Sequence, residues 1–306
     1  MYSFDKYPRP AGHFIAADGV SLPYFAYGNE DAKETILFLN GFTCNQFNIA
    51  KIIRGLAPYF RIYTFDYRGQ GIAYREKYAQ VSVDAVLSDI DALHEHLGRI
   101  PIHLFGYSMG CQLAVEWNHR GNHHVKSVVL LMGIYGNIFD TFLNLRIFAP
   151  LLKITKELFP ALKGLYRLAW RSAHRLPYPM RVGLGRGALL NPELTSEEEL
   201  RPFLDQLADL DFEYILHMAH AIHEHSNDGQ FHSIAAPCLV ISGESDLFAL
   251  PIHSERVHQA VGSSWYFSIP RGTHNAVLEN ADDIVGWVME FFTAKKLLPA
   301  KSGSAS

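Results

Sequence analysis

The stretch Ile102-His103-Leu104-Phe105-Gly106-Tyr107-Ser108-Met109-Gly110 decides the fold of this chain. Its first four residues form a short apolar run typical of a buried strand, and residues 111–117 have the composition of a helix. The pattern Gly-x-Ser-x-Gly at 106–110 therefore predicts a tight strand-to-helix turn that exposes the serine at the end of the strand. Glycines on both sides permit the strained backbone and the close packing of such a turn.

The composition is that of an ordinary globular protein. The chain has 306 residues, 48% hydrophobic and 19% charged, which suits one large domain with an insertion, or two domains. A formal net charge of −4 argues against a general nucleic-acid binder. The sequence has no apolar run long enough for a spanning helix and no signal pattern at residues 1–6. Three widely spaced cysteines (Cys44, Cys111 and Cys238) suit a reducing compartment, so the expected location is cytoplasmic.

Strands and helices alternate along the first half of the chain. Continuous apolar runs are typical of strands whose two faces are both covered by helices. We therefore predict an α/β core with a mostly parallel, doubly wound sheet. An Asp18-Gly19 turn predicts an early hairpin, and Ser82 and Gly98 bound one of the helices. The expected strands are 35–39, 61–65, 102–105 and 125–132, and the expected helices are 47–58 and 83–97.

The alternation stops after residue 136. Residues 138–232 have helical patterns without a strand, and prolines at 150, 160, 177, 179 and 192 are expected to break the helices. Strand patterns return at 237–243 and 264–269, with helices at 252–261 and 281–296. The predicted division is a core of 1–136 and 233–298, an inserted all-helical segment of 137–232, and a flexible tail of 299–306.

A serine hydroxyl needs a base and an orienting acid before it acts as a nucleophile. Active groups on such sheets follow the carboxyl ends of strands, where Asp246 and His274 stand. The order Ser108, Asp246, His274 is the one expected for a serine on this turn. Each residue alone has a structural alternative, since an aspartate after a strand is often a helix cap. Glu244 is the nearest rival acid, and Asp140 is a weaker one.

Acyl transfer also needs donors for the oxyanion that forms on the carbonyl oxygen. The turn offers the backbone N–H of Met109, and the loop after residues 35–39 offers the N–H of Phe42. This chemistry requires neither a cofactor nor a metal.

Four blocks in this order resemble the α/β-hydrolase fold superfamily of esterases, lipases and lactonases. They are residues 66–71 (Asp-Tyr-Arg-Gly-Gln-Gly), 106–110, 243–246 (Gly-Glu-Ser-Asp) and 272–274 (Gly-Thr-His). The resemblance covers nearly all of residues 20–295 and implies a serine hydrolase with a helical cap at 137–232. One departure is Asn40-Gly41, where the family commonly has His-Gly; we expect Asn40 to hydrogen-bond within the loop. A serine at 108 in place of aspartate disfavours the dehalogenase and epoxide-hydrolase branches.

The cap sequence is rich in large apolar residues, among them Phe139 and Phe142. Together with Tyr107, these two are expected to contact an apolar substrate. The alternative is that the apolar residues of the cap only pack its helices together.

Charge divides the cap into two parts. Residues 141–190 contain nine Lys or Arg and one acidic residue, Glu157, whereas 191–230 contain ten acidic residues and Arg201. The two parts can pair or be solvated, or the basic part can dock on an anionic membrane or receive an acidic substrate. His217, His220, His223, His225 and Glu224 lack the usual signature of a metal site, and we expect none.

The sequence therefore predicts a hydrolase of carboxylic esters with apolar acyl groups. A lactonase, thioesterase or carbon–carbon bond hydrolase would use the same residues. A non-catalytic relative that binds a small ligand is the alternative outside enzymes. The expected partner is a small apolar ester or lactone, and the oligomeric state is left open.

Overall fold

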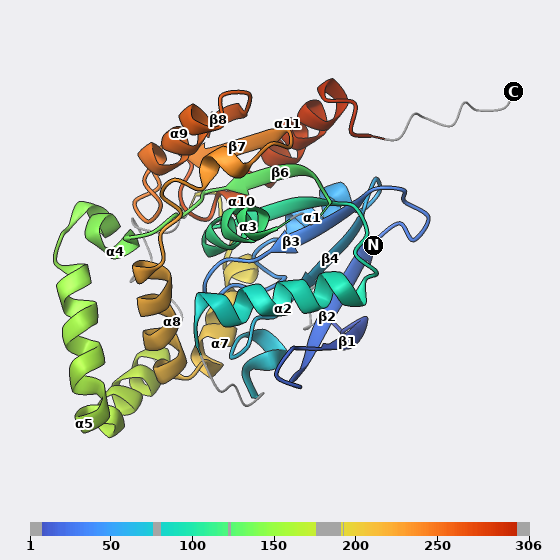
Figure 1. The fold of residues 1–306 in the computed structure, drawn as a ribbon. Helices are drawn as coiled ribbons and strands as arrows, with labels where there is room; N and C mark the ends of the chain where they lie inside the picture. The colour runs from blue at the N-terminus through green and yellow to red at the C-terminus, as the bar shows by residue number, and fades with distance from the viewer. Residues whose placement is uncertain (1–7, 76–80, 122–123, 176–190, 192, 299–306) are drawn as a thin grey trace, which may run out of the picture.

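The computed structural model describes residues 8–75, 81–121, 124–175, 191 and 193–298. The tail at 299–306 and the prolines at 177, 179 and 192 lie outside these residues. An eight-stranded sheet runs through the molecule in the order β1-β2-β4-β3-β5-β6-β7-β8 (Figure 1). Its strands are β1 (Gly12–Ile15), β2 (Ser21–Gly28), β3 (Thr35–Leu39), β4 (Arg61–Phe65), β5 (Ile102–Tyr107), β6 (Val125–Leu131), β7 (Cys238–Gly243) and β8 (Trp265–Ile269).

The predicted mostly parallel sheet is confirmed. Strands β3 to β8 are parallel to one another. The antiparallel pairs are β1 with β2, joined by the Asp18-Gly19 turn, and β2 with β4. Every residue of β3, β5 and β7 is buried. These are the strands whose sequences are unbroken apolar runs, because helices cover both faces.

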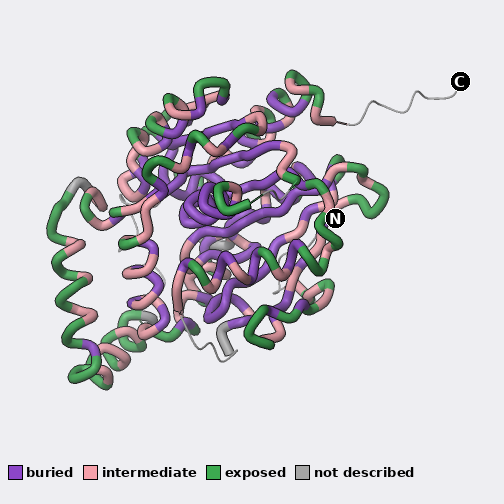
Figure 2. The backbone as a smooth tube through the Cα atoms, in the orientation of Figure 1, coloured by how far each residue is buried: buried purple, intermediate pink, exposed green. Residues whose placement is uncertain are grey.

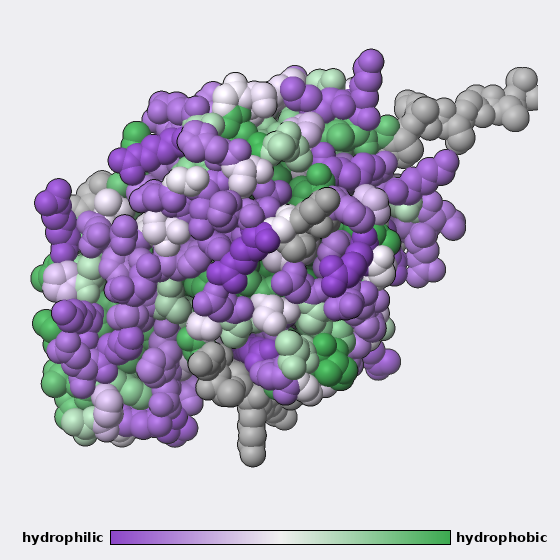
Figure 3. Space-filling view, viewed as in Figure 1, coloured by the Kyte–Doolittle hydropathy of each residue, from purple (hydrophilic) through white to green (hydrophobic). Residues whose placement is uncertain are grey.

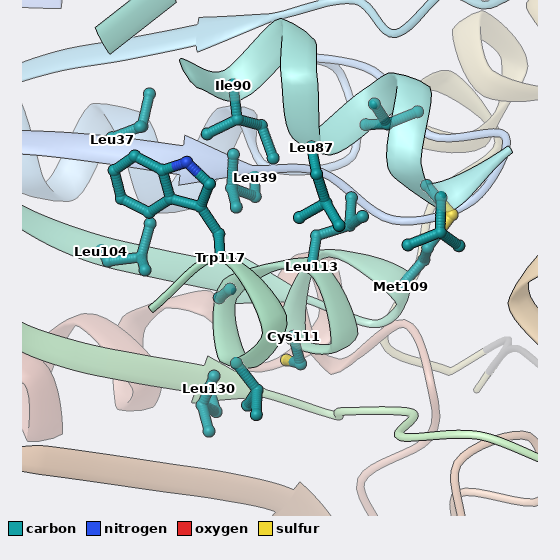
Figure 4. Close-up of a cluster of buried hydrophobic side chains, with 14 of the residues drawn as sticks. Leu37, Leu39, Leu87, Ile90, Leu104, Met109, Cys111, Leu113, Trp117 and Leu130 are labelled. Atoms are coloured by element: carbon teal, nitrogen blue, oxygen red, sulfur yellow. The ribbon is translucent and has the colours of Figure 1, made fainter. Parts of the chain in front are cut away.

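The helices of the core form two layers. One apolar cluster joins the sheet to α2 (Val83–His96), α3 (Met109–Arg120) and α9 (Pro251–Ala260). The other joins it to α1 (Ala50–Leu56), α10 (Ala276–Glu279) and α11 (Ala281–Ala294). In the first cluster, Trp117 and Leu113 of α3 lie between Leu87 and Ile90 of α2 and the strands below (Figure 4). Figure 2 shows the strands as the most deeply buried part of the chain.

Between β6 and β7 the described residues form helices and no strand. They are α4 (Ile138–Thr141), η2 (Phe142–Asn144), α5 (Phe148–His174), α7 (Glu197–Asp209), α8 (Phe212–Glu224) and η3 (Phe231–Ser233); η1 (Gly71–Arg75) follows β4. The helical character of this segment agrees with the sequence, while the division into core and cap domains stays a prediction. Among the helices that the structure describes, none has the length and apolar composition needed to cross a membrane.

The expectation that Pro150 breaks a helix is wrong, because this residue lies within α5. Pro150 is in the first turn, where backbone N–H groups have no partner within the helix. The interruption expected at Pro160 is present as a kink: Leu162 departs from helical geometry with φ −113° and ψ 16°, so α5 consists of two helical segments that meet there. Smaller differences are a shorter α1 and the additional short helix α10, while α2 begins after Ser82 as predicted.

His103 of β5 couples the stability of the sheet to pH. Its side chain is fully buried, with Nδ1 2.8 Å from Ser127 Oγ and Nε2 3.0 Å from Glu34 Oε2. Burial lowers the pKa of His103 from 6.5 to about 4, and the opposing effect of Glu34 is smaller. Between these pH values the unfolded chain binds more protons than the native one, so the free energy of unfolding falls as pH falls.

We predict that this loss is smaller in a His103→Gln variant. From about pH 6.5 to 4, the wild type should lose up to about 3 kcal/mol more than the variant, measured by urea unfolding at a series of pH values. His119→Gln, at an exposed histidine, is the control and should follow the wild type. Parallel curves for the wild type and His103→Gln would contradict the assignment.

Candidate active site

Ser108 occupies the predicted turn between β5 and α3. Its backbone has φ 54° and ψ −119°, a conformation that side-chain-bearing residues seldom adopt. Hydrogen bonds hold it: Ser108 N donates to Leu131 O at 3.0 Å, and Ser108 O accepts from Cys111 N at 2.9 Å. The flanking glycines are required by close approach, since a Cβ on Gly106 would lie 2.6 Å from the carbonyl oxygen of Gly110. The turn predicted from the sequence is thus present.

Ser108, His274 and Asp246 form one hydrogen-bonded chain. His274 Nε2 lies 2.8 Å from Ser108 Oγ, and His274 Nδ1 lies 2.8 Å from Asp246 Oδ2. The loops after β5, β7 and β8 meet here because the carboxyl ends of parallel strands share one edge of the sheet. All three residues are buried. This arrangement can pass a proton from the hydroxyl to an imidazole whose other nitrogen is already engaged.

The structure brings Asp246, and neither rival acid, to the imidazole. Asp246 is 1% exposed, and its second oxygen, Oδ1, accepts the N–H groups of Phe248 and Ala249, each at 2.8 Å. Glu244 is exposed and accepts the N–H of Arg271 at 3.4 Å, and Asp140 is exposed on α4. A carboxylate held from both sides in this way keeps one orientation toward His274.

Two aromatic residues hold the imidazole, and sequence reasoning missed the first. The Phe248 ring lies 4.6 Å from the His274 ring between centroids, with 34° between their planes. Tyr107 donates its O–H to the backbone carbonyl of His274 at 3.0 Å. The only signal for Phe248 is its position two residues after Asp246. Tyr107 was expected as a substrate contact; it lines the cavity described below and also fixes this loop.

The loop after β3 lies against the serine. A Cβ on Gly41 would stand 3.1 Å from Ser108 Cβ, so this backbone passes directly beside the hydroxyl-bearing residue. Met109 is the first residue of α3, where an N–H has no acceptor within the helix. Asn40 was expected to hydrogen-bond within the loop, but its Nδ2 donates to Thr64 Oγ1 of β4 at 3.1 Å. The assignment of Phe42 and Met109 as oxyanion donors stays a prediction.

Cys44 is the thiol beside this site. It is buried, and burial raises its pKa to about 12, so it stays protonated at neutral pH. Ser108 therefore has no thiolate competitor at this position.

A cavity of about 660 Å³ opens over Ser108 and His274. Phe139 and Phe142 line it as expected, and most of the remaining lining comes from α5, α7 and α8. Among the lining residues that the structure describes, His274 is the only one of a type that can carry positive charge, and none is acidic. The cavity is therefore suited to an uncharged apolar group that extends away from the serine.

Three of the histidines between residues 217 and 225 have other partners in the structure. His223 Nδ1 accepts the N–H of Phe139 at 3.4 Å, and His225 Nε2 lies 3.1 Å from Glu116 Oε2. His220 approaches Glu224 at 3.9 Å. Within the described part of the chain, no group of three or more potential ligands could hold a metal ion.

Part of the charge division of the cap appears as ion pairs between α5 and α8. Lys163 lies 2.6 Å from Glu213, and Arg167 contacts both Asp211 and Glu213 at 3.0 and 3.1 Å. The expectation that the basic and acidic parts pair thus holds for these two cations.

We predict that Tyr107→Phe destabilises the protein by about 1–3 kcal/mol, because a buried carbonyl loses its donor. The free energy of unfolding in urea measures the change. Tyr59→Phe is the matched control, since the Tyr59 side chain is 51% exposed and water can replace its contacts. Equal stability of Tyr107→Phe and the wild type would show that this hydrogen bond does not hold the loop.

Comparisons with known proteins agree with this geometry. A model of the alpha/beta hydrolase fold family matches residues 34–281. N-formylmaleamate deformylase of Pseudomonas putida is 28% identical over 121 residues, which are 40% of this chain and 44% of that protein. The aligned part thus spans less than half the length of that relative.

Solved structures are similar over nearly the whole chain. An enol-lactonase from Burkholderia xenovorans has a TM-score of 0.72 and 21% identity, covering 92% of this chain and 99% of its own. A meta-cleavage product hydrolase from Pseudomonas fluorescens has a TM-score of 0.72 and 19% identity, with 96% and 100% covered. An esterase from Exiguobacterium antarcticum has a TM-score of 0.67 and 17% identity, with 92% and 99% covered. At these identities the likeness establishes the fold.

Proposed function

The chain belongs to the alpha/beta hydrolase fold family, and on that premise we propose that it is a serine hydrolase of carboxylic esters with apolar acyl groups. One observation carries the proposal: the hydrogen-bonded chain from Ser108 through His274 to Asp246 lies at the base of an apolar cavity.

In the proposed mechanism, Ser108 Oγ attacks the ester carbonyl while His274 Nε2 takes its proton. Asp246 accepts the Nδ1–H and stabilises the imidazolium. The N–H groups of Phe42 and Met109 bind the oxyanion, and His274 then protonates the departing alcohol. Water, deprotonated by the same imidazole, releases the acid from the acyl-enzyme and restores Ser108. No cofactor takes part.

The lining supports a neutral acyl group. A buried carboxylate would lack a cationic partner among the described lining residues, and an unpaired buried charge is costly. Residues 137–232 act in this proposal as a cap, since α5, α7 and α8 supply the apolar walls.

The second candidates are hydrolysis of a lactone or of a carbon–carbon bond. They are favoured by the names of two structural neighbours, an enol-lactonase and a meta-cleavage product hydrolase. A lactone is an internal ester, so the same attack by Ser108 opens its ring.

Loss of the nucleophile or its acid should abolish turnover. We predict that Ser108→Ala and Asp246→Asn each lower kcat on a p-nitrophenyl ester by about 10⁴-fold, because the first removes the nucleophile and the second the acceptor for Nδ1–H. Ser245→Ala and Glu244→Gln, at exposed neighbours, are the matched controls and should retain activity. A fluorophosphonate probe should label the wild type and not Ser108→Ala. Folded wild type that neither reacts nor turns over would favour a ligand-binding protein.

Acyl preference tests the cavity. We predict that kcat/KM rises by up to about fourfold per added methylene along a series of p-nitrophenyl esters, because each methylene leaves water. An ester with a terminal carboxylate should react at least about tenfold more slowly than its neutral isostere. Leu204→Arg places a cation in the cavity wall and should reduce the difference in rate between the carboxylate ester and its neutral isostere. Leu194→Arg, outside the lining, should leave that difference unchanged. A flat length series, or faster cleavage of the carboxylate ester by the wild type, would contradict the apolar site.

A further inference from the structure

Helix α5 presents an unusual apolar ridge to solvent. Seven large aliphatic residues follow one another at intervals of three or four, four before the kink at Leu162 and two after it; this spacing places those of each helical segment on one side of that segment. Their exposed fractions run from 39% at Leu162 to 63% at Ile147. The α5 ridge consists of Ile147, Leu151, Ile154, Leu158, Leu162, Leu165 and Leu168.

The ridge is not the side by which α5 packs on the molecule. Phe159 is buried, the Tyr166 ring stacks on Phe212 at 5.5 Å, and Trp170 Nε1 donates to Leu210 O at 3.1 Å. These contacts fasten α5 to α8 and leave the ridge outside. Figure 2 shows α5 as largely exposed, and Figure 3 shows hydrophobic surface at the edge of the molecule where α5 lies, beside hydrophilic side chains.

Exposed large hydrophobic residues are concentrated here. Of twelve such residues in the described part of the chain, eight lie between positions 145 and 168. The other four lie apart in the sequence: Ile15 in β1, Ile252 in α9, and Tyr59 and Leu194 outside helices and strands. A contiguous apolar surface of this kind marks an interaction site, whereas isolated exposed residues do not.

Charge identifies the kind of partner. Residues 145–175 contain seven Lys or Arg and one acidic residue, Glu157. Lys163 and Arg167 pair with α8, while Arg146, Lys153, Arg171 and Arg175 are exposed. A second copy packed on the ridge would bring two such cationic helices together. An anionic surface instead meets these charges favourably, and long Lys and Arg side chains reach its headgroups.

The ridge also leads into the cavity. Leu151 is 51% exposed and at the same time lines the cavity, and Leu152 and Thr155 continue the lining from the same helix. We propose that α5 docks on an anionic phospholipid surface, with its ridge among the acyl chains and its basic residues at the headgroups. Entry of an apolar ester from the lipid into the cavity additionally rests on the proposed function.

Co-sedimentation with vesicles tests the docking. The full chain should bind vesicles of phosphatidylcholine with about 30% phosphatidylglycerol at least about tenfold more strongly than pure phosphatidylcholine, and binding should weaken as salt rises. Ile154→Ser/Leu158→Ser/Leu165→Ser and Lys153→Glu/Arg171→Glu should each lower the partition coefficient about tenfold or more. Ile252→Ser/Arg256→Glu on α9 is the matched control and should bind like the wild type.

Assays of ester hydrolysis distinguish a failure of membrane docking from a failure of the proposed esterase activity. None of the substituted residues lines the cavity, so all three variants should cleave a soluble short ester at the wild-type rate. Ser108→Ala should still sediment with the vesicles. Absence of wild-type binding, or equal binding of the ridge variant and the wild type, would overturn the docking. So would a dimer in analytical ultracentrifugation that the ridge substitutions dissociate, since α5 would then be a self-interface.

Discussion

Asp246 is 1% exposed, so both oxygens of its carboxylate need hydrogen-bond donors from the protein. The arrangement of the whole site depends on those hydrogen bonds. One oxygen accepts two backbone N–H groups from its own loop after β7, and the other accepts from His274, in the loop after β8. The same imidazole reaches Ser108, in the turn after β5. The hydrogen bonds of one buried carboxylate and the imidazole beside it thus hold together three loops that are distant in sequence.

The residues around Ser108, His274 and Asp246 limit the movement of these three side chains. Phe248 packs on one ring face, and Tyr107 ties the His274 backbone to β5. The backbone at the start of α3 leaves no room for a side chain at Gly106, and the end of β3 leaves none at Gly110. Rigidity of this kind is what a proton transfer over 2.8 Å requires, because small displacements lengthen the hydrogen bond.

Helix α5 has two apolar sides with different surroundings. Phe159 and Trp170 pack toward α8, whereas Ile154 and Leu158 face solvent. Because α5 bends near Pro160, its two segments run in different directions, and residues of both line the cavity. The side toward α8 is aromatic and the exposed side is aliphatic, but an apolar composition alone does not show which of the two faces solvent.

The sequence by itself determined the order of strands and helices in the core, the Ser108 turn and the candidates Asp246 and His274. These features depend on local periodicity and on where loops follow strands, which neighbouring residues set. Tertiary structure decided that Asp246 rather than Glu244 meets the imidazole and that Phe248 supports it. It also decided which apolar residues of the helices between β6 and β7 face the cavity and which face water. Such outcomes depend on contacts between segments far apart in the chain, and no local pattern encodes them.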